Sequence, residues 1–319
     1  MRVVCLAGGV GGAKLADGLQ QVLAAGELTV VVNTGDDFER HSLLICPDHD
    51  TVAYTLSGVA DPAQGWGLAG ETWQVMDQLA RLGRATWFRI GDRDLATHLY
   101  RADLLRAGMR LTEAALELQR ALGVPSRILP MADESIRTGV RTDDGWLDFQ
   151  DYFVRLRQAP EVREVRYEGA EASTVTPEVR AAVQAAEAIV VAPSNPVVSI
   201  GPILAVPGLI EEIRSARDRG VKVVGVSGIV GGKAVRGPAD RMLASLGEES
   251  SALGVARRYA SVGLLDAFFI DRTDEAMAGQ IRSLGLEVAV TDTIMTDVAD
   301  RGRLAGEVLA LAVPSRTSA

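Results

Sequence analysis

A glycine-rich turn near the N-terminus is the clearest chemical signal in this chain. The apolar run 3–7 ends in four glycines and a valine, namely Gly8, Gly9, Val10, Gly11 and Gly12. Glycine has no Cβ, so the backbone can turn tightly and approach a ligand closely. A helix is predicted from Ala13, and its free N–H groups and positive end would face the turn. The pattern predicts phosphate binding, and the alternative is a tight strand-to-helix turn without a ligand.

This turn departs from two familiar nucleotide-binding motifs. Lys14 stands where the dinucleotide fingerprint needs a further glycine. The Gly-Lys-Ser or Gly-Lys-Thr sequence of a Walker A loop does not occur in the chain. An NAD-dependent dehydrogenase is therefore disfavoured.

Carboxylates follow the next strand-like run, 28–34. Asp36 and Asp37 come directly after it, and Asp48 and Asp50 lie shortly before or within the start of a predicted helix. Together they predict an oxygen-rich pocket suited to Mg²⁺, which can bridge phosphate oxygens and neutralise charge during transfer. The alternative for Asp48 or Asp50 is an N-cap on that helix.

A third segment alternates arginine and aspartate between Arg89 and His98. Arg89 and Arg93 are candidates for substrate contacts, with the neighbouring acids orienting them. A solvated turn with an N-cap at Asp92 or Asp94 is the alternative. His98 is expected to be a packed or surface histidine rather than a catalyst.

Two further loops follow predicted strands. Ser194 and Asn195 lie between two prolines that restrict the backbone, so their hydroxyl and amide groups can face a ligand. The glycine-rich loop 227–233 ends in Lys233 and resembles a P-loop only superficially, because Ala234 replaces the required Ser or Thr. We expect a second phosphate-binding site here.

Alternating strand-like and helical segments predict the elements that position these loops. The strands are apolar and β-branched without alternation, as in strands buried on both faces. They are expected at 2–7, 28–34, 188–192, 221–226, 265–270 and 286–290. Helices are expected at 13–24, 68–82, 93–107, 112–122, 177–187, 208–219, 237–246, 252–260, 273–284 and 296–312. The predicted fold class is α/β: a Rossmann-like, doubly wound, mostly parallel sheet with helices on both faces, which binds ligands beyond the carboxyl ends of its strands.

A single domain is expected over 1–312, with a small α+β excursion at about 95–170 and a frayed tail at 313–319. Within the excursion, an Asp-Gly pair predicts the turn of a hairpin over 137–149. No repeat or low-complexity linker divides the chain.

Composition disfavours several functions. The net charge is −9 and aromatic residues make up 5%, which disfavours a nucleic-acid-binding face. Two cysteines, Cys5 and Cys46, are too few for a disulfide framework and predict buried thiols in a reducing cytoplasm. No apolar run reaches the length of a membrane helix, so a cytoplasmic protein without a membrane partner is expected. Without a Cys/His cluster or a nucleophile elbow, phosphoryl transfer is the favoured chemistry.

Four motifs resemble the 2-phospho-L-lactate transferase family, which includes the actinobacterial phosphoenolpyruvate transferases. They are the run 28–37, the turn 47–51, the segment 91–98 and the loop 193–202. The resemblance extends from the first strand to about residue 312 and implies an enzyme of coenzyme F-420 biosynthesis. Such an enzyme takes a phospholactyl or enolpyruvyl-phospho group from a guanosine diphosphate-linked donor. It transfers this group to the ribityl hydroxyl of the deazaflavin Fo and releases GMP.

The resemblance also implies roles for the candidate residues. Asp36 and Asp50 are expected to hold Mg²⁺ and to act catalytically. The expected contacts to the deazaflavin acceptor are Asp50, Arg89, Asp92 and Arg93. The expected contacts to the phosphates and the nucleotide are Gly8, Gly9, Val10, Gly11, Gly12, Ser194, Asn195 and Lys233.

The sequence leaves some alternatives open. A non-catalytic regulator with the same sheet and glycine turn, which binds a sugar nucleotide, is the alternative function. The acid carried by the donor is lactate, enolpyruvate or glycerate, and either Asp36 or Asp50 is the candidate general base. A homodimer is expected because it is common among such folds.

Overall fold

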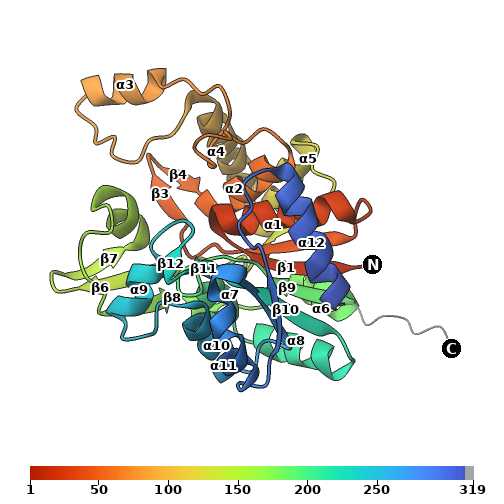
Figure 1. Cartoon of the computed structure of the whole chain (residues 1–319). Helices are drawn as coiled ribbons and strands as arrows, with labels where there is room; N and C mark the ends of the chain where they lie inside the picture. The colour runs from red at the N-terminus through yellow and green to blue at the C-terminus, as the bar shows by residue number, and fades with distance from the viewer. Residues whose placement is uncertain (313–319) are drawn as a thin grey trace.

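A seven-stranded parallel sheet forms the centre of the structure (Figure 1). The computed structural model describes residues 1–312, so the predicted tail 313–319 lies outside the described residues. The sheet order is β14-β13-β10-β9-β1-β2-β5, and all neighbouring strands run parallel. The strands are β1 (Val3–Ala7), β2 (Leu28–Val32), β5 (Arg127–Pro130), β9 (Ala188–Val191), β10 (Lys222–Val226), β13 (Ala267–Asp271) and β14 (Glu287–Thr291).

Helices cover both faces of this sheet, which confirms the predicted α/β fold. Strand β1 shows the two faces, because Val3 and Cys5 pack into one core and Val4 and Leu6 into the other. The first core contains α1 (Gly9–Val22), α2 (Pro47–Leu56) and α12 (Val298–Ala312). The second contains α6 (Pro177–Ala185), α8 (Leu209–Asp218), α10 (Ala252–Ser261) and α11 (Ala278–Arg282).

Smaller antiparallel sheets extend from the main sheet. The predicted hairpin is confirmed as β6 (Arg137–Thr142) and β7 (Gly145–Asp148), and β8 (Glu164–Glu168) pairs with the other edge of β6. Two further hairpins are β3 (Phe38–Arg40) with β4 (Leu43–Ile45) and β11 (Ile229–Val230) with β12 (Lys233–Ala234). The remaining α-helices are α3 (Gln74–Arg81), α4 (Asp92–Arg106), α5 (Leu111–Ala121), α7 (Ile200–Ala205) and α9 (Ala239–Ser245).

Several elements differ from the prediction, and three of them bear on the site or the sheet. Strand β5 joins the edge of the main sheet although it lies within 95–170, the range predicted to be an excursion from that sheet. Helix α1 begins at Gly9 rather than Ala13, so the glycine segment is the first helical turn itself. The predicted helix 68–82 shortens to α3, because its first residues form a loop.

Between residues 1 and 312, no helix is both long enough and apolar enough to span a membrane.

Candidate active site

A cavity of about 680 Å³ opens at the carboxyl end of the main sheet. The loops that follow β1, β2, β9 and β10 all contribute to its wall. These loops and the first turn of α1 supply Gly8, Gly9, Val10, Gly11, Asp36, Ser194, Asn195 and Ser227. Parallel sheets bind ligands at this edge, so the cavity is the candidate site.

The N-terminus of α1 forms one wall of the cavity. The helix begins at Gly9, and no side chain of its N-cap residue, Gly8, can cap it. The first N–H groups of a helix have no partner within the helix, and they carry its positive partial charge. This wall can therefore bind an anion.

The glycines of this segment also allow two loops to pack closely. A Cβ on Gly11 would lie 2.6 Å from the carbonyl oxygen of Pro193, and one on Gly12 would lie 2.5 Å from Ser194 Oγ. Ser194 Oγ accepts the Gly8 N–H at 3.0 Å and donates to the Gly8 carbonyl oxygen at 2.8 Å. The loops after β1 and β9 can approach this closely only with glycine at these positions. Gly12 lies beneath the cavity and does not line it.

Asn195 lines the cavity and shapes its own loop. Its Oδ1 accepts the backbone N–H of Val197 at 2.8 Å. Only its amide nitrogen, which lies 3.9 Å from Met242 Sδ, remains available to a ligand. The side chain therefore acts first as a turn-forming group and second as a hydrogen-bond donor.

Two carboxyl groups with raised pKa values face the start of α1. Asp48 Oδ2 accepts from Asn33 Nδ2 at 2.9 Å, and its carboxylate also accepts the Gly9 N–H. Burial raises the pKa of Asp48 to about 6 in spite of these bonds. Burial and the nearby Asp48 charge raise the pKa of Asp36 well above its ordinary value. Asp36 Oδ1 has no hydrogen-bond partner in the described part of the chain.

Asp50 of α2 lies opposite Arg101 of α4, and both side chains are buried. The Arg101 guanidinium donates to Asp50 Oδ1 and to the Leu44 carbonyl oxygen, the latter at 3.1 Å. Burial alone would raise the pKa of Asp50, but Arg101, with a contribution from the nearby His49, lowers it to about 2. Asp50 is therefore ionised at neutral pH. Its Oδ2 atom has no hydrogen-bond partner within residues 1–312.

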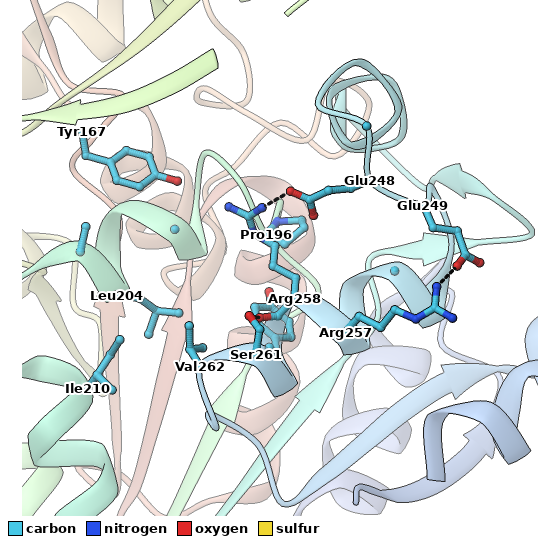
Figure 2. Close-up of a pocket in the computed structure, with 15 residues that line it drawn as sticks. Tyr167, Pro196, Leu204, Ile210, Glu248, Glu249, Arg257, Arg258, Ser261 and Val262 are labelled. Carbon is cyan, nitrogen blue, oxygen red and sulfur yellow. Dashed lines mark hydrogen bonds and ion pairs between the residues drawn. The ribbon is translucent and has the colours of Figure 1, made fainter. Parts of the chain in front are cut away.

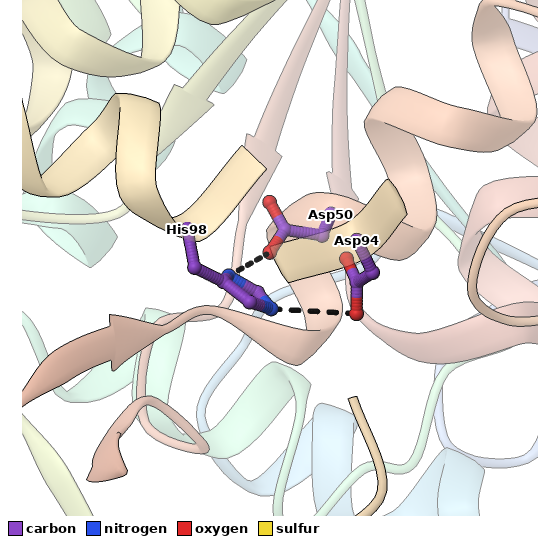
Figure 3. Close-up of side chains that lie close together, drawn as sticks. All are labelled: Asp50, Asp94 and His98. Carbon is purple, nitrogen blue, oxygen red and sulfur yellow. Dashed lines mark ion pairs between the residues drawn. The ribbon is translucent and has the colours of Figure 1, made fainter. Parts of the chain in front are cut away.

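His98 lies between Asp50 and Asp94 (Figure 3). Arg101 Nη1 lies 3.1 Å from His98 Nδ1, and because arginine only donates, Nδ1 is the acceptor. His98 Nε2 then faces Asp94 Oδ2 at 3.3 Å. The Tyr54 hydroxyl donates to Asp94 Oδ1 at 2.6 Å. These contacts fix the orientation of the imidazole and of both carboxylates.

The same side chains include a candidate metal-binding group. Donor atoms of Asp50, Asp94 and His98 all lie within 4.8 Å of one another. Asp36 lines the same cavity but does not belong to this group. Of these buried side chains, only Asp50 was predicted from the sequence to belong to the site, whereas Asp94, His98 and Arg101 were not. Their spacing, which places all three on one face of α4, was the available signal.

Three residues predicted to contact the substrate lie outside the cavity. Asp92 accepts two backbone N–H groups at the start of α3, at 2.9 and 3.0 Å, and so fixes that helix in place. Arg93 is exposed and donates to the Ala69 carbonyl oxygen at 2.5 Å. Lys233 is exposed and lies 3.8 Å from Asp240. The side chains of Asp92 and Arg93 are held by these hydrogen bonds. Lys233 lies on the β11–β12 hairpin, outside the cavity.

Arg89 lies on the outer wall of the cavity among aromatic side chains. Its guanidinium is 4.1 Å from the ring centroid of Trp73. Phe88, Phe153 and Trp66 also line the cavity. The cavity therefore offers cations and several apolar rings to a ligand.

A second cavity, of about 740 Å³, lies between α7, α8 and α10 (Figure 2). Its charged groups are paired with each other, Arg258 with Glu248 at 2.5 Å and Arg257 with Glu249. None of the residues predicted to form the site lines it. The cavity at the strand ends is therefore the better candidate.

Comparison with solved structures agrees with the observed fold. The crystal structure of a UPF0052 family protein from Bacillus halodurans superimposes with a TM-score of 0.64 at 15% identity, covering 97% of this chain and 98% of that chain. At that identity, the likeness shows the fold alone.

Closer relatives cover nearly the whole chain. A phosphoenolpyruvate transferase from Streptomyces griseus is 44% identical over 98% of this chain and 98% of its own length. One from Mycobacterium avium is 39% identical over 98% and 99%. A 2-phospho-L-lactate transferase from Methanosarcina mazei is 37% identical over 95% and 98%. The family model for 2-phospho-L-lactate transferase CofD matches residues 3–304. The chain belongs to the 2-phospho-L-lactate transferase CofD family.

Proposed function

We propose that this chain transfers a phospholactyl or enolpyruvyl-phospho group from a guanosine diphosphate-linked donor to the deazaflavin Fo, with release of GMP. The observation that carries the proposal is the juxtaposition, in one cavity, of the N-terminus of α1 with the carboxylate oxygens of Asp36 and Asp50 that have no hydrogen-bond partner among the described residues. The names of the relatives support the same reaction class. Family membership also favours the transferase over a non-catalytic regulator.

The cavity walls suggest where each substrate binds. The donor diphosphate fits the start of α1, where N–H groups and the helix dipole favour an anion. The acceptor fits the side lined by Asp50 and Arg89, where aromatic rings face the cavity. The acceptor hydroxyl would then lie between the carboxylates and the diphosphate.

The donor set of the cavity fits Mg²⁺. Asp36 and Asp50 each present a buried carboxylate oxygen that has no hydrogen-bond partner within residues 1–312, and carboxylate oxygens are preferred ligands of this ion. Asp50 and Asp36 would hold the ion, with Asp94 beside Asp50. When bound, Mg²⁺ supplies positive charge to the phosphoryl oxygens.

The chemistry is an in-line displacement at phosphorus. The acceptor oxygen forms a bond to the phosphorus that carries the acid, the bridging P–O bond breaks, and GMP leaves with that electron pair. The proton of the acceptor hydroxyl passes to a carboxylate. Asp36 and Asp50 are both candidates for this base, although a carboxylate bound to Mg²⁺ is a weak one. The N–H groups of α1 stabilise the charge that develops on the leaving phosphate.

Replacement of Asp50 by Asn tests the proposal. Purified protein is incubated with Fo, Mg²⁺ and each guanylylated donor, and mass spectrometry and chromatography measure product and GMP. We expect the wild type to form both and Asp50→Asn to lose at least about 100-fold in turnover, since a charged group at the reacting centre is removed.

The control is Asp218→Asn, at the exposed end of α8. Because Asp50→Asn leaves Arg101 without its partner, Asp36→Asn serves as a second test, and circular dichroism verifies folding. Near-normal GMP release by both folded variants would refute the assigned roles.

A further inference from the structure

Trp66 is a large apolar side chain that the fold leaves on the wall of the cavity. It lies in the loop between α2 and α3, and 42% of its surface is exposed. It belongs to none of the buried core clusters. Contact between an exposed tryptophan ring and water is unfavourable. A ligand that covers the ring removes this cost, so the exposed ring favours ligand binding.

The loop that carries Trp66 is ordered without help from the indole ring. Asp61 N–H donates to the Gly67 carbonyl oxygen at 3.0 Å, and Gly65 N–H donates to the Asp61 carbonyl oxygen at 2.7 Å. Gly65 and Gly67 have φ of +74° and +68°, a conformation that favours glycine. Across the cavity mouth, Arg236 donates to another carbonyl oxygen of the loop. The backbone therefore holds residue 66 in a defined position.

The other tryptophans differ from Trp66 in one respect. Each has an arginine guanidinium over its ring: Arg89 over Trp73 at 4.1 Å, Arg40 over Trp87 at 5.0 Å and Arg166 over Trp146 at 3.9 Å. Trp66 has no such cation among the described residues. Its ring face is thus free to stack on something else.

Apolar groups from other segments line the same cavity. Val235 is 56% exposed, and Phe88 and Phe153 are partly buried there. Phe153 itself stacks on Phe149 with ring centroids 5.4 Å apart. Flat apolar walls of this kind suit a planar ring system.

We propose that Trp66 stacks on a planar fused heteroaromatic ring bound in this cavity. Two ligands carry such a ring if the proposed function holds: the acceptor, with its deazaflavin, and the donor, with its guanine. The inference rests on the proposed function for the identity of these ligands. The shared chemistry, an aromatic plane over the indole, does not depend on transfer taking place.

Dissociation constants of Trp66→Ala and Trp66→Phe test the proposal. Calorimetry with Fo alone and with GDP alone shows whether Trp66 stacks on the deazaflavin or on the guanine. Riboflavin and ADP serve as further ligands that carry a planar ring but are not substrates or products of the proposed reaction. We expect Trp66→Ala to weaken binding of Fo or of GDP by about 10-fold or more, and Trp66→Phe to retain most of it. The control is Trp146→Ala, which removes a tryptophan outside the cavity.

The outcomes separate this inference from the proposed function. Loss of ring binding in Trp66→Ala supports stacking even when the wild type shows no transfer. Equal dissociation constants in wild type and Trp66→Ala for every ring-bearing probe would overturn it, whatever the turnover. Failure of all four probes to bind the wild type would overturn it as well.

Discussion

The pKa values of two carboxyl groups on α2, two positions apart, are shifted in opposite directions. Asp50 faces the Arg101 guanidinium, which lowers its pKa to about 2 against the effect of burial. Asp48 is equally buried, and its hydrogen bonds with Asn33 and the Gly9 N–H offset only part of the effect of burial, so its pKa rises to about 6. The side-chain type is the same, so the partner contributed by another element decides the charge.

The pKa of Asp48 predicts a pH dependence of stability. Its folded pKa of about 6 lies above the ordinary value of 3.8, so the stability present below pH 4 is lost as pH rises through 6. The shift corresponds to about 3 kcal/mol in the free energy of unfolding at most. Asp48→Asn should remove this dependence, and urea unfolding of both proteins between pH 4 and 7 measures it. Parallel profiles for the two proteins would contradict the assignment.

Only some of the residues that the sequence predicted for the site line the cavity. Three of the predicted charged residues line the cavity, namely Asp36, Asp50 and Arg89. Each of them follows the end of a strand or lies on a segment that folds over the strand ends. Asp92 and Arg93 do not line it, because their side chains form hydrogen bonds with backbone groups of the segment that precedes them. The course of that segment in space could not be predicted from the sequence pattern. For the same reason, the Arg101 pairing with Asp50 was not foreseeable.

The element that matters most to the site is α1. Its glycine segment was predicted as a turn before the helix, but it forms the first helical turn. Glycine is a poor helix former, so the pattern favoured a later start at Ala13. The packing of Gly11 and Gly12 against the loop after β9 supplies the stabilisation that overrides this preference.

Gly11→Ala tests the importance of that close approach. The added Cβ would lie 2.6 Å from the Pro193 carbonyl oxygen, so the start of α1 and the loop after β9 must separate. We expect the dissociation constant for GDP to rise by about 10-fold or more, because small displacements of positioning groups are costly. The measurement is isothermal titration calorimetry. Gly306→Ala, in α12 with no atom near its Cβ, is the matched control. Unchanged GDP affinity in Gly11→Ala would argue against nucleotide binding at this wall.

Prediction of elements succeeded best for long apolar strands. Strands β1, β2, β9, β10, β13 and β14 lie where the sequence predicted them. Strand β5 was missed because Arg127–Pro130 is short and ends in proline, which usually argues against a sheet strand. Proline is tolerated on an edge strand, and β5 lies at the edge of the sheet, next to β2.

At the scale of the whole molecule, the C-terminal helix supports the N-terminal one. Helices α1 and α12 cross at Gly18, where a Cβ would run directly into the Arg301 carbonyl oxygen (Figure 1). Arg301 also pairs with Asp17 at 3.0 Å. The cavity wall formed by α1 therefore depends on residues almost 300 positions further along the chain.

Gly18→Ala tests this support. The substitution forces the two helices apart, and we expect a loss of about 2 kcal/mol in the free energy of unfolding, typical of overpacking. GDP affinity should fall as well, since α1 shifts. Chemical denaturation and calorimetry measure the two effects. A Gly18→Ala protein as stable as the wild type would show that the contact between α1 and α12 is dispensable.

Strand β1 has a consequence for synthesis on the ribosome. It pairs on one edge with β2, at 28–32, and on the other with β9, at 188–191. About 160 residues must be translated between the two partners, which takes on the order of ten to thirty seconds. During that interval the nascent chain carries an apolar strand with one open edge, a template for wrong pairing. The nascent N-terminal half is therefore most prone to incorrect strand pairing during this interval, when protection by a chaperone would matter most.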